Sequence, residues 1–458
     1  MGFRFMKMKY IGWFCFFLLI TISGKSQETS SLFLLPGVPQ SSVFNPALQN
    51  ENDKLVIGVP FLSGLSGSWN ANSPFDALFS KGFSYNVGRL YDELKPRGEA
   101  NASGQLSMFY ASLKHNDYTF RLSVSERMYA NGIFDRDIVK IIRDGTEPYY
   151  GANENFGKAD FHFQYFRELS FSVSKNIWKG LDIGIAPKIL FGRMGFDARE
   201  LSLSVETDTE NDILLVKPEG SFLMSGAFNH VYYPEFDRSV FLADFYPGDY
   251  FFQPRNLGFA IDWGIVYRPD KFTELSASLL DIGFTTLKYN TFNVDFAVPA
   301  RYSEDDLYQS TNPDGENYLE PREALLIFSD TVSYLINVEE ATERTLTFLP
   351  VTLNLSGKYH FSERVSGGIN NQFTWFRNQP RNLFAAFIQA RTGRRVELAG
   401  SLSVLNLSAV RPGFGVSWTL PKIQFYFSSN NILGIIQPTS SKHLNLSIGM
   451  NLLFDTQK

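Results

Sequence analysis

The residues of this sequence that could carry chemistry are few and widely separated. Its five histidines are His115, His162, His230, His360 and His443. None of them stands in a His-Glu-x-x-His pattern or at the Cys/His spacing of a zinc site. The serine of Gly64-Leu65-Ser66-Gly67 lacks both the full nucleophile-elbow pattern and the helix that should follow it. We therefore predict no catalytic residue, no metal site, no cofactor and no enzymatic activity.

An acidic segment from Asn293 to Arg344 contains 12 acidic and 3 basic residues. Four of its residues approximate the start of a calcium loop, namely Ser310, Asn312, Asp314 and Gly315. Pro321 stands where the closing glutamate of that loop should be, so a solvated acidic loop is the preferred interpretation and calcium binding the alternative. Farther along, Asp330-Thr331-Val332 resembles the O-glycan acceptor motif of Bacteroidota secreted proteins.

The first 26 residues are predicted to be a signal peptide. Arg4, Lys7 and Lys9 precede an apolar run from Tyr10 to Ile22, and small residues lead to a cleavage site near Gln27. The only cysteine lies in this run, without the small residues that precede a lipoprotein cysteine. Cleavage leaves 38 basic against 47 acidic residues and no cysteine. Disulfides and thiolate sites are thereby excluded, and the negative charge argues against nucleic acid.

The remaining sequence alternates between apolar and polar residues in many short runs. In the run from Tyr118 to Ser125, for example, Thr119, Arg121, Ser123 and Ser125 alternate with apolar residues. The runs Leu257–Tyr267 and His443–Phe454 behave in the same way. Such strands fit either a soluble sandwich or an outer-membrane barrel, whose strands face lipid on one side and the lumen on the other.

The connections between these runs favour the barrel, because short and long connections alternate. The short ones are His115–Asp117, Lys175–Gly180, Pro269–Phe272, Ser362–Arg364, Thr392–Arg395 and Pro421–Lys422. The long ones are Asn70–Asn101, Gly132–Lys158, Gly195–Pro254, Val294–Arg344 and Asn430–Lys442, with short exceptions near Asn378–Arg381 and Ala409–Pro412. Outer-membrane barrels combine short periplasmic turns with long external loops. After residue 26, no run approaches the roughly 20 apolar residues of a spanning helix.

The predicted fold is therefore all-β, an antiparallel transmembrane outer-membrane barrel of about 14 strands with long external loops. Residues 1–26 are assigned to the signal peptide, 27–53 to an N-terminal segment and 54–458 to the barrel. The first strand is expected to run unbroken from about Leu55 to Trp69. A phase shift in the alternation at Pro350 indicates a bulge. Two loop segments, Glu320–Asn337 and the isoleucine-rich stretch around Ile138, are expected to be partly helical.

Several stretches carry a family resemblance over the whole mature chain. Ser31–Gln49, Leu275–Phe284 and Ser428–Pro438 resemble a family of uncharacterised Bacteroidota outer-membrane barrels. The triplet Asn45-Pro46-Ala47, just before the first strand, is similar to that of the FadL and PorV types of barrel. In those 14-stranded barrels the residues before the first strand fold into the lumen as a plug. The resemblance therefore implies that residues 27–53 form an N-terminal plug here. Most of the sequence departs from FadL, so the resemblance does not specify a ligand or its binding residues.

Two functions remain open at this stage. The first is FadL-like binding or passage of a small, mostly apolar molecule. The second is a non-enzymatic partner or scaffold subunit of a larger outer-membrane machine, for type IX secretion or outer-membrane protein assembly. The expected location is the outer membrane, with extracellular loops and both termini periplasmic. The expected partners are outer-membrane lipid and, through the long loops, other outer-membrane proteins.

Overall fold

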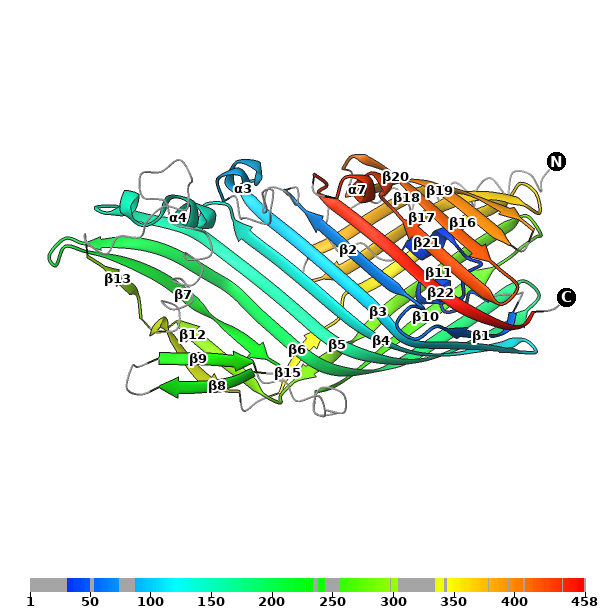
Figure 1. The fold of residues 1–458 in the computed structure, drawn as a ribbon, viewed down its shortest axis with the longest axis horizontal. Helices are drawn as coiled ribbons and strands as arrows, with labels where there is room; N and C mark the ends of the chain where they lie inside the picture. Colours follow the sequence, from blue (N-terminus) through cyan, green and yellow to red (C-terminus); the bar gives the residue numbers. More distant parts are fainter. Residues whose placement is uncertain are drawn as a thin grey trace, which may run out of the picture.

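The computed structural model describes 31–49, 53–73, 87–226, 228–233, 238–243, 256–296, 298–303, 334–341, 344–377, 379–393, 395–406, 408–438 and 440–456 (Figure 1). The predicted signal peptide, the calcium-like residues 310–321 and the motif 330–332 lie outside these ranges. Among the residues described, no helix is long and apolar enough to cross a membrane.

The strands form a closed antiparallel barrel of 14 strands, as predicted. Each strand pairs with the next around the ring, and β22 returns to pair with β1 and β2. Two ring positions are each made of two consecutive segments, β1 with β2 and β15 with β16. In ring order the segments are β1 (Asp53–Gly58), β2 (Leu65–Ala71), β3 (Arg97–His115), β4 (Tyr118–Asp135), β5 (Asn153–Trp178), β6 (Leu181–Asp208), β10 (Leu257–Tyr267), β11 (Thr273–Leu287), β15 (Thr345–Phe348), β16 (Val351–His360), β17 (Val365–Phe376), β18 (Gln379–Thr392), β19 (Val396–Leu405), β20 (Val410–Thr419), β21 (Ile423–Ser429) and β22 (His443–Thr456).

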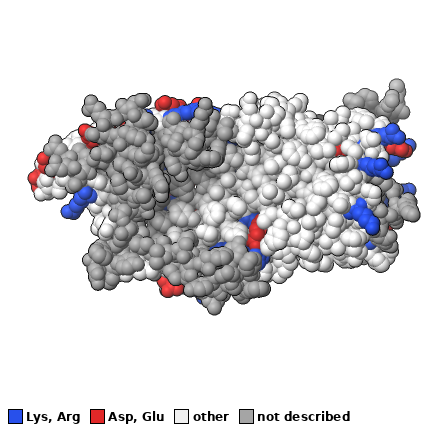
Figure 2. All heavy atoms as spheres, viewed as in Figure 1, with Lys and Arg blue, Asp and Glu red and all other residues white. Residues whose placement is uncertain are grey.

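The two faces of this barrel differ in the way the alternating sequence requires. Outward side chains are apolar and exposed: Leu122 is 41% exposed, Phe259 55% and Leu402 59%. Inward neighbours are polar and buried, such as Arg121 at 5% and Ser403 at 0%. In Figure 2 the middle of the barrel surface carries few charges, while Lys and Arg gather at the short-turn end. A closed barrel with an apolar exterior and a polar interior is an outer-membrane β-barrel.

The expected long loops at 132–158 and 195–254 are in part strands. β5 has 26 residues and β6 has 28, whereas a tilted strand crosses a membrane in about 9–11 residues. Both strands therefore continue beyond the barrel, on the side away from the two termini (Figure 1). The alternation had concealed this extension because the pairing shifts register near Gly157 and Glu200, both at positive φ, which breaks the period of two.

Further elements join this extension and give it a small core of its own. β7 pairs with β6, β12 and β13, and β12 pairs with β14. The core consists of Tyr149, Phe156, Val205 and Leu214. The described helices and strands outside the ring and the N-terminal segment are α3 (Val87–Glu93), α4 (Ile138–Asp144), η3 (Glu147–Tyr149), β7 (Ile213–Ser225), β8 (Phe228–Tyr233), β9 (Arg238–Ala243), β12 (Thr291–Phe296), β13 (Ala300–Tyr302), β14 (Ile336–Glu340) and α7 (Ile432–Ile436). Of these, β8 and β9 form a separate two-stranded sheet, and α7 packs against β20 and β22. The helix expected around Ile138 is α4, whereas the segment expected to be helical at 320–337 is described only from residue 334, just before β14.

The first strand is interrupted, contrary to the expectation of one continuous strand. Gly58 pairs with Asn451 and Leu65 with Ile448, so six residues, 59–64, face only two on β22. Phe61, at φ 64°, and Leu62 bulge outward and are 55% and 57% exposed. Because the outward residues stay apolar through the insertion, the sequence pattern gave no sign of the break. At Pro350 the break between β15 and β16 lies where the phase shift predicts it.

Candidate functional site

The N-terminal segment 31–49, hereafter the plug, lies inside the barrel at the short-turn end (Figure 1). It forms two short helices, η1 (Ser31–Leu34) and η2 (Pro39–Val43). Among its apolar side chains Leu34, Leu35 and Val38 are fully buried, at 0% exposure. The described part of this segment therefore lies in the lumen, whereas the assignment of residues 27–53 as a plug that blocks passage stays a prediction.

The triplet Asn45-Pro46-Ala47 fixes the plug to the barrel wall. The Asn45 Nδ2 donates to the backbone oxygens of Ile265 and Ala277, each at 3.2 Å, and its Oδ1 accepts the Ala47 N–H at 2.9 Å. The carboxamide thus closes a local turn and bridges β10 and β11. This geometry gives the Asn-Pro turn a docking role that turn propensity alone does not supply.

Two glycines of the wall make room for this turn. A Cβ added at Gly264 would lie 2.0 Å from Asn45 Oδ1, and one at Gly184 would lie 2.3 Å from the backbone carbon of Pro46. Real Cβ contacts are not that short, so glycine is required for the close approach of the two backbones.

Side chains from around the barrel satisfy the polar backbone of the plug. Tyr110 donates to Pro39 O at 2.9 Å and Ser278 to Phe44 O at 2.7 Å. The other wall residues that bond to the plug are Arg121, Asn354, Gln389, Glu397, Gln424, Ser428 and Asn451. The plug has little regular structure of its own, so these bonds replace those that a helix or sheet would supply.

The apolar side chains of the plug fill a recess in the lumen wall. Leu32, Phe33, Leu34, Leu35, Val38 and Phe44 cluster with the wall residues Ala385, Phe387, Ala399 and Tyr426. The rings of Phe33 and Phe387 meet edge to face, with centroids 5.8 Å apart. These four wall residues, called here the apolar recess, form an apolar region on a lumen wall that is mostly polar.

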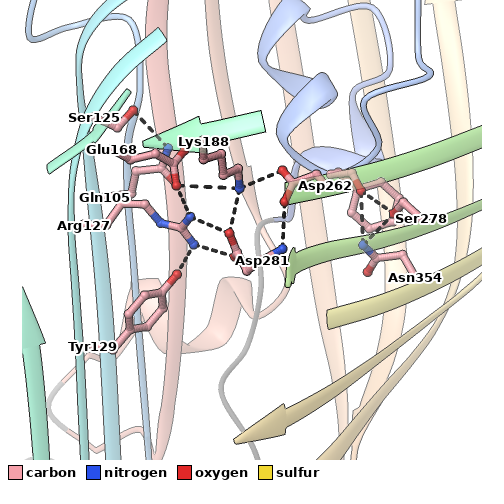
Figure 3. A network of polar contacts seen from close by, with 11 residues as sticks. Gln105, Ser125, Arg127, Tyr129, Glu168, Lys188, Asp262, Ser278, Asp281 and Asn354 are labelled. Atoms are coloured by element: carbon pink, nitrogen blue, oxygen red, sulfur yellow. Dashed lines mark hydrogen bonds and ion pairs between the residues drawn. The ribbon is translucent and has the colours of Figure 1, made fainter. Parts of the chain in front are cut away.

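A buried charged network lies beside the plug on five consecutive strands, β4, β5, β6, β10 and β11 (Figure 3). Lys188 Nζ lies 2.7 Å from Asp262 Oδ2 and 2.6 Å from Asp281 Oδ1. Arg127 pairs with Glu168 and Asp281 and donates to the Tyr129 hydroxyl. Two cations thus face three carboxylates inside the barrel, all of them less than a tenth exposed. Mutual pairing offsets the cost of removing these charges from water.

A bulge in β11 positions the central carboxylate of this network. Two residues, Leu280 and Asp281, stand opposite Asp262 because the register shifts between Ile261 and Trp263. Asp281 has φ 60°, and its N–H donates to Asp262 Oδ1 at 2.7 Å. The left-handed conformation turns the Asp281 side chain toward Arg127 and Lys188 (Figure 3). Such strain persists only where the surroundings hold it, and it often marks a functional position.

Two cavities border the plug. One, of about 70 Å³, is lined by several serines and by Arg121, Glu168, Lys188 and Asp262, together with plug residues that include Leu32 and Val43. The other, of about 80 Å³, is lined by Val43, Phe44, Arg127, Tyr129 and Asp281, among others. Each has room for a few water-sized groups but falls well below the roughly 300–1,000 Å³ of a typical ligand pocket. Neither cavity is therefore large enough for a typical small-molecule ligand while the plug lies in this position.

The remaining sequence candidates are not assembled into a site. Gly64 and Ser66 lie where β1 gives way to β2, with no helix following. His115 and His360 lie at short turns, whereas His162 and His443 lie elsewhere along the lumen. Within the described part of the chain, no group of three or more His, Cys, Asp or Glu side chains could hold a metal ion.

Sequence reasoning missed the charged network. Its members are too far apart to form a motif: Arg127 and Asp281, for instance, are 154 positions apart. The available signal was positional, since Lys188, Asp262 and Arg127 stand near the middle of long strands on the polar face. A charge in such a place needs a partner across the lumen.

Comparison with known proteins gives a family and a set of similar folds. A model described as a family of unknown function, DUF5723, matches residues 46–430. No curated protein matches the chain. A Pseudomonas aeruginosa FadL homologue is similar with a TM-score of 0.47 at 10% identity, over 95% of this chain and 100% of that one. The Ralstonia pickettii toluene transporter TbuX gives 0.45 at 10% identity over 91% and 94%, and the CymD monoaromatic hydrocarbon channel 0.45 at 9% over 92% and 94%.

Proposed function

Since the chain belongs to the DUF5723 family of unknown function, we propose a function from the contacts inside its lumen. The protein is a non-enzymatic outer-membrane barrel that binds or passes a small, mostly apolar molecule, and the plug controls this binding or passage. The carrying observation is the apolar recess. The plug fills it with its own apolar side chains. Withdrawal of the plug would expose Ala385, Phe387, Ala399 and Tyr426 to the lumen, where an apolar molecule could take its place.

The interrupted first strand supports the same proposal. Gly64 and Ser66 border the serine-rich cavity, while Phe61, Leu62 and Leu65 are exposed on the apolar outer face. Beside the plug, an interrupted strand therefore separates the lumen from the apolar exterior. A molecule with low solubility in water would have a short path between the two.

Deleting residues 31–44 tests the proposal. We expect higher conductance in planar bilayers, because the deletion removes both short helices of the plug while the barrel strands remain. Purified wild-type barrel should also carry a detergent or lipid molecule beside the plug. Both measurements use the complete barrel reconstituted from detergent.

A point variant tests whether displacing the plug, without deleting it, has the same effect. Gly184→Val should also raise conductance, because its side chain would collide with Pro46 and Ala47. Gly400→Val is the matched control: a Cβ there meets only Ile388 Cγ2, at 4.0 Å, so its conductance should equal that of the wild type.

A second candidate function is favoured by the external extension of β5 and β6. A sheet that continues beyond the membrane with its own core offers a rigid surface to another protein, as a partner or scaffold subunit of a secretion or barrel-assembly machine would need. Unchanged conductance in the deletion and in Gly184→Val, together with a stoichiometric protein partner in native purification, would support this candidate against the first.

The proposed orientation places the extension outside the cell and both termini in the periplasm. The mature chain lacks cysteine, so single cysteines can be labelled on intact cells. We expect labelling at Asn153, at the start of β5, and at Asp314, which lies outside the described residues. Asn116 and Gly393, both exposed in short turns, should stay unlabelled until the cells are opened. Labelling of the second pair on sealed cells would reverse the orientation.

A further inference from the structure

Arg121 is a buried cation that forms no ion pair with any residue the structure describes. Its side chain lies on the inner face of β4, and the residue is 5% exposed. The Nη1 donates to Pro46 O at 3.2 Å and to Ser174 Oγ at 3.4 Å, and the Nη2 donates to Leu48 O. Among the residues that the structure describes, no carboxylate lies within ion-pair distance of this guanidinium. All its acceptors are neutral, which leaves a buried positive charge without a counter-ion.

The cavity that Arg121 lines is rich in hydroxyl groups. Its serines include Ser107, Ser123, Ser125, Ser170, Ser172 and Ser447. Two of them, Ser172 and Ser447, are 7% and 1% exposed, and their Oγ atoms have no hydrogen-bond partner in the protein. Ser172 pairs directly with Arg121 in the β4–β5 register, so its hydroxyl lies on the same face, beside the guanidinium. As far as the described residues show, the cavity therefore offers a ligand one cation without a counter-ion and two hydroxyl groups without partners.

The two ends of this cavity differ in charge. Its other end is formed by Glu168, Lys188 and Asp262 of the charged network, which holds two cations against three carboxylates. Glu168 and Ser172 are four residues apart on β5, about 13 Å along an extended strand. An anion is thus attracted to the Arg121 end and repelled from the network end.

We propose that this cavity is an oxyanion site, in which Arg121 and the Ser172 and Ser447 hydroxyls bind a carboxylate or phosphate group. A guanidinium binds such groups with charge-assisted hydrogen bonds, which are stronger than its bonds to neutral carbonyls. The anion would compete with Pro46 O and Leu48 O for the same N–H donors. Binding therefore loosens the plug at the end next to the first strand. This coupling rests on the proposed function, whereas the binding site itself does not.

Inorganic phosphate is the probe for the site. Full-length barrel in an uncharged detergent is titrated with phosphate by calorimetry, with chloride holding the ionic strength constant. We expect saturable binding of one phosphate per barrel. Arg121→Gln should weaken it by roughly tenfold or more, because hydrogen bonds to charged groups are lost. Arg364→Gln, at an exposed short turn, should bind as the wild type does.

Arg121→Gln also removes hydrogen bonds to the plug, so a second variant is needed. Ser172→Ala serves this purpose, since Ser172 makes no hydrogen bond to the described part of the plug. It should weaken phosphate binding several-fold in a barrel that unfolds like the wild type. Equal binding by the wild type, Arg121→Gln and Ser172→Ala, or no saturable binding by the wild type, would overturn the site. Octyl phosphate distinguishes the source of the anion. Tighter binding than phosphate assigns the site to the head of an amphiphile, and equal or weaker binding assigns it to a free anion.

The coupling has its own readout. In a Ser41→Cys variant the single thiol of the mature chain lies in the buried η2 (3% exposed at Ser41). Phosphate should raise the labelling rate of this thiol several-fold, and the effect should be absent when Arg121→Gln is added. If phosphate binds but the labelling rate is unchanged, the coupling is wrong. If deletion of residues 31–44 nevertheless raises conductance, the proposed function stands without it.

Discussion

Replacing Lys188 by methionine should lower the free energy of unfolding by about 3–5 kcal/mol. Lys188 lies within 2.7 Å of Asp262, 2.6 Å of Asp281 and 3.6 Å of Glu168. Methionine keeps the length of the side chain but removes the charge, which leaves three buried carboxylates with Arg127 as their one remaining cation in the network. Removing one partner of a buried ion pair costs more than the pair itself contributes. Denaturant unfolding of the barrel reconstituted in lipid measures this loss.

Lys179→Met is the matched control for this variant. Lys179 lies exposed at the short turn between β5 and β6, so the same chemical change there should alter stability by less than about 0.5 kcal/mol. If Lys188→Met unfolds like the wild type and like this control, the network is hydrated or protonated, and it does not contribute to stability as a set of buried ion pairs.

Ile448→Arg should destabilise the barrel by about 2–4 kcal/mol, because it places a charge near the middle of the bilayer. Ile448 is 37% exposed on the outer face of β22, and it pairs with Leu65 and Phe427 in the neighbouring strands. It lies about midway along the stretch of β22 that crosses the membrane. The same unfolding assay in lipid reports the cost.

The cost of an outward-facing arginine depends on its depth in the bilayer, so a second position on the same face of β22 serves as the control. Phe454 is 41% exposed near the short-turn end of β22, where an arginine should cost only about 0–1 kcal/mol for its charge. A small cost at both positions would mean that Ile448 faces water and not lipid, and the membrane assignment of the outer face would be wrong.

The alternating pattern predicted the barrel because burial in this fold repeats every second residue. The pattern failed where a strand is interrupted or shifts register while its outward side chains remain apolar. Phe61 and Leu62 keep the outer face apolar through the insertion in the first strand, so the break is invisible in the sequence. Gly157 and Glu200 produce register shifts in β5 and β6, and the stretches beyond them resemble loops. Alternation reports which face a residue occupies but not how far a strand continues.

The lumen could be predicted only in part. Asn45-Pro46-Ala47 stands next to the first strand, so a local motif was enough to indicate a plug. The glycines that receive it, Gly184 and Gly264, lie in other strands, and nothing local marks them as contacts. The charged network and the unpaired Arg121 depend on which strands face each other across the barrel. That arrangement is set by the closure of the whole ring.

The contacts of the plug determine the order in which the molecule can be assembled. The plug precedes all the barrel strands in the sequence. The side chains that hold it include Gln389, Glu397, Gln424, Ser428 and Asn451, which belong to the last five strands. Gln40 and Asn451 are 411 positions apart, as distant as the strands that form the seam. Contacts between such distant parts of a chain form late. The plug therefore cannot complete its contacts before the last strand is in place, and the late step that closes the seam also completes the docking of the plug.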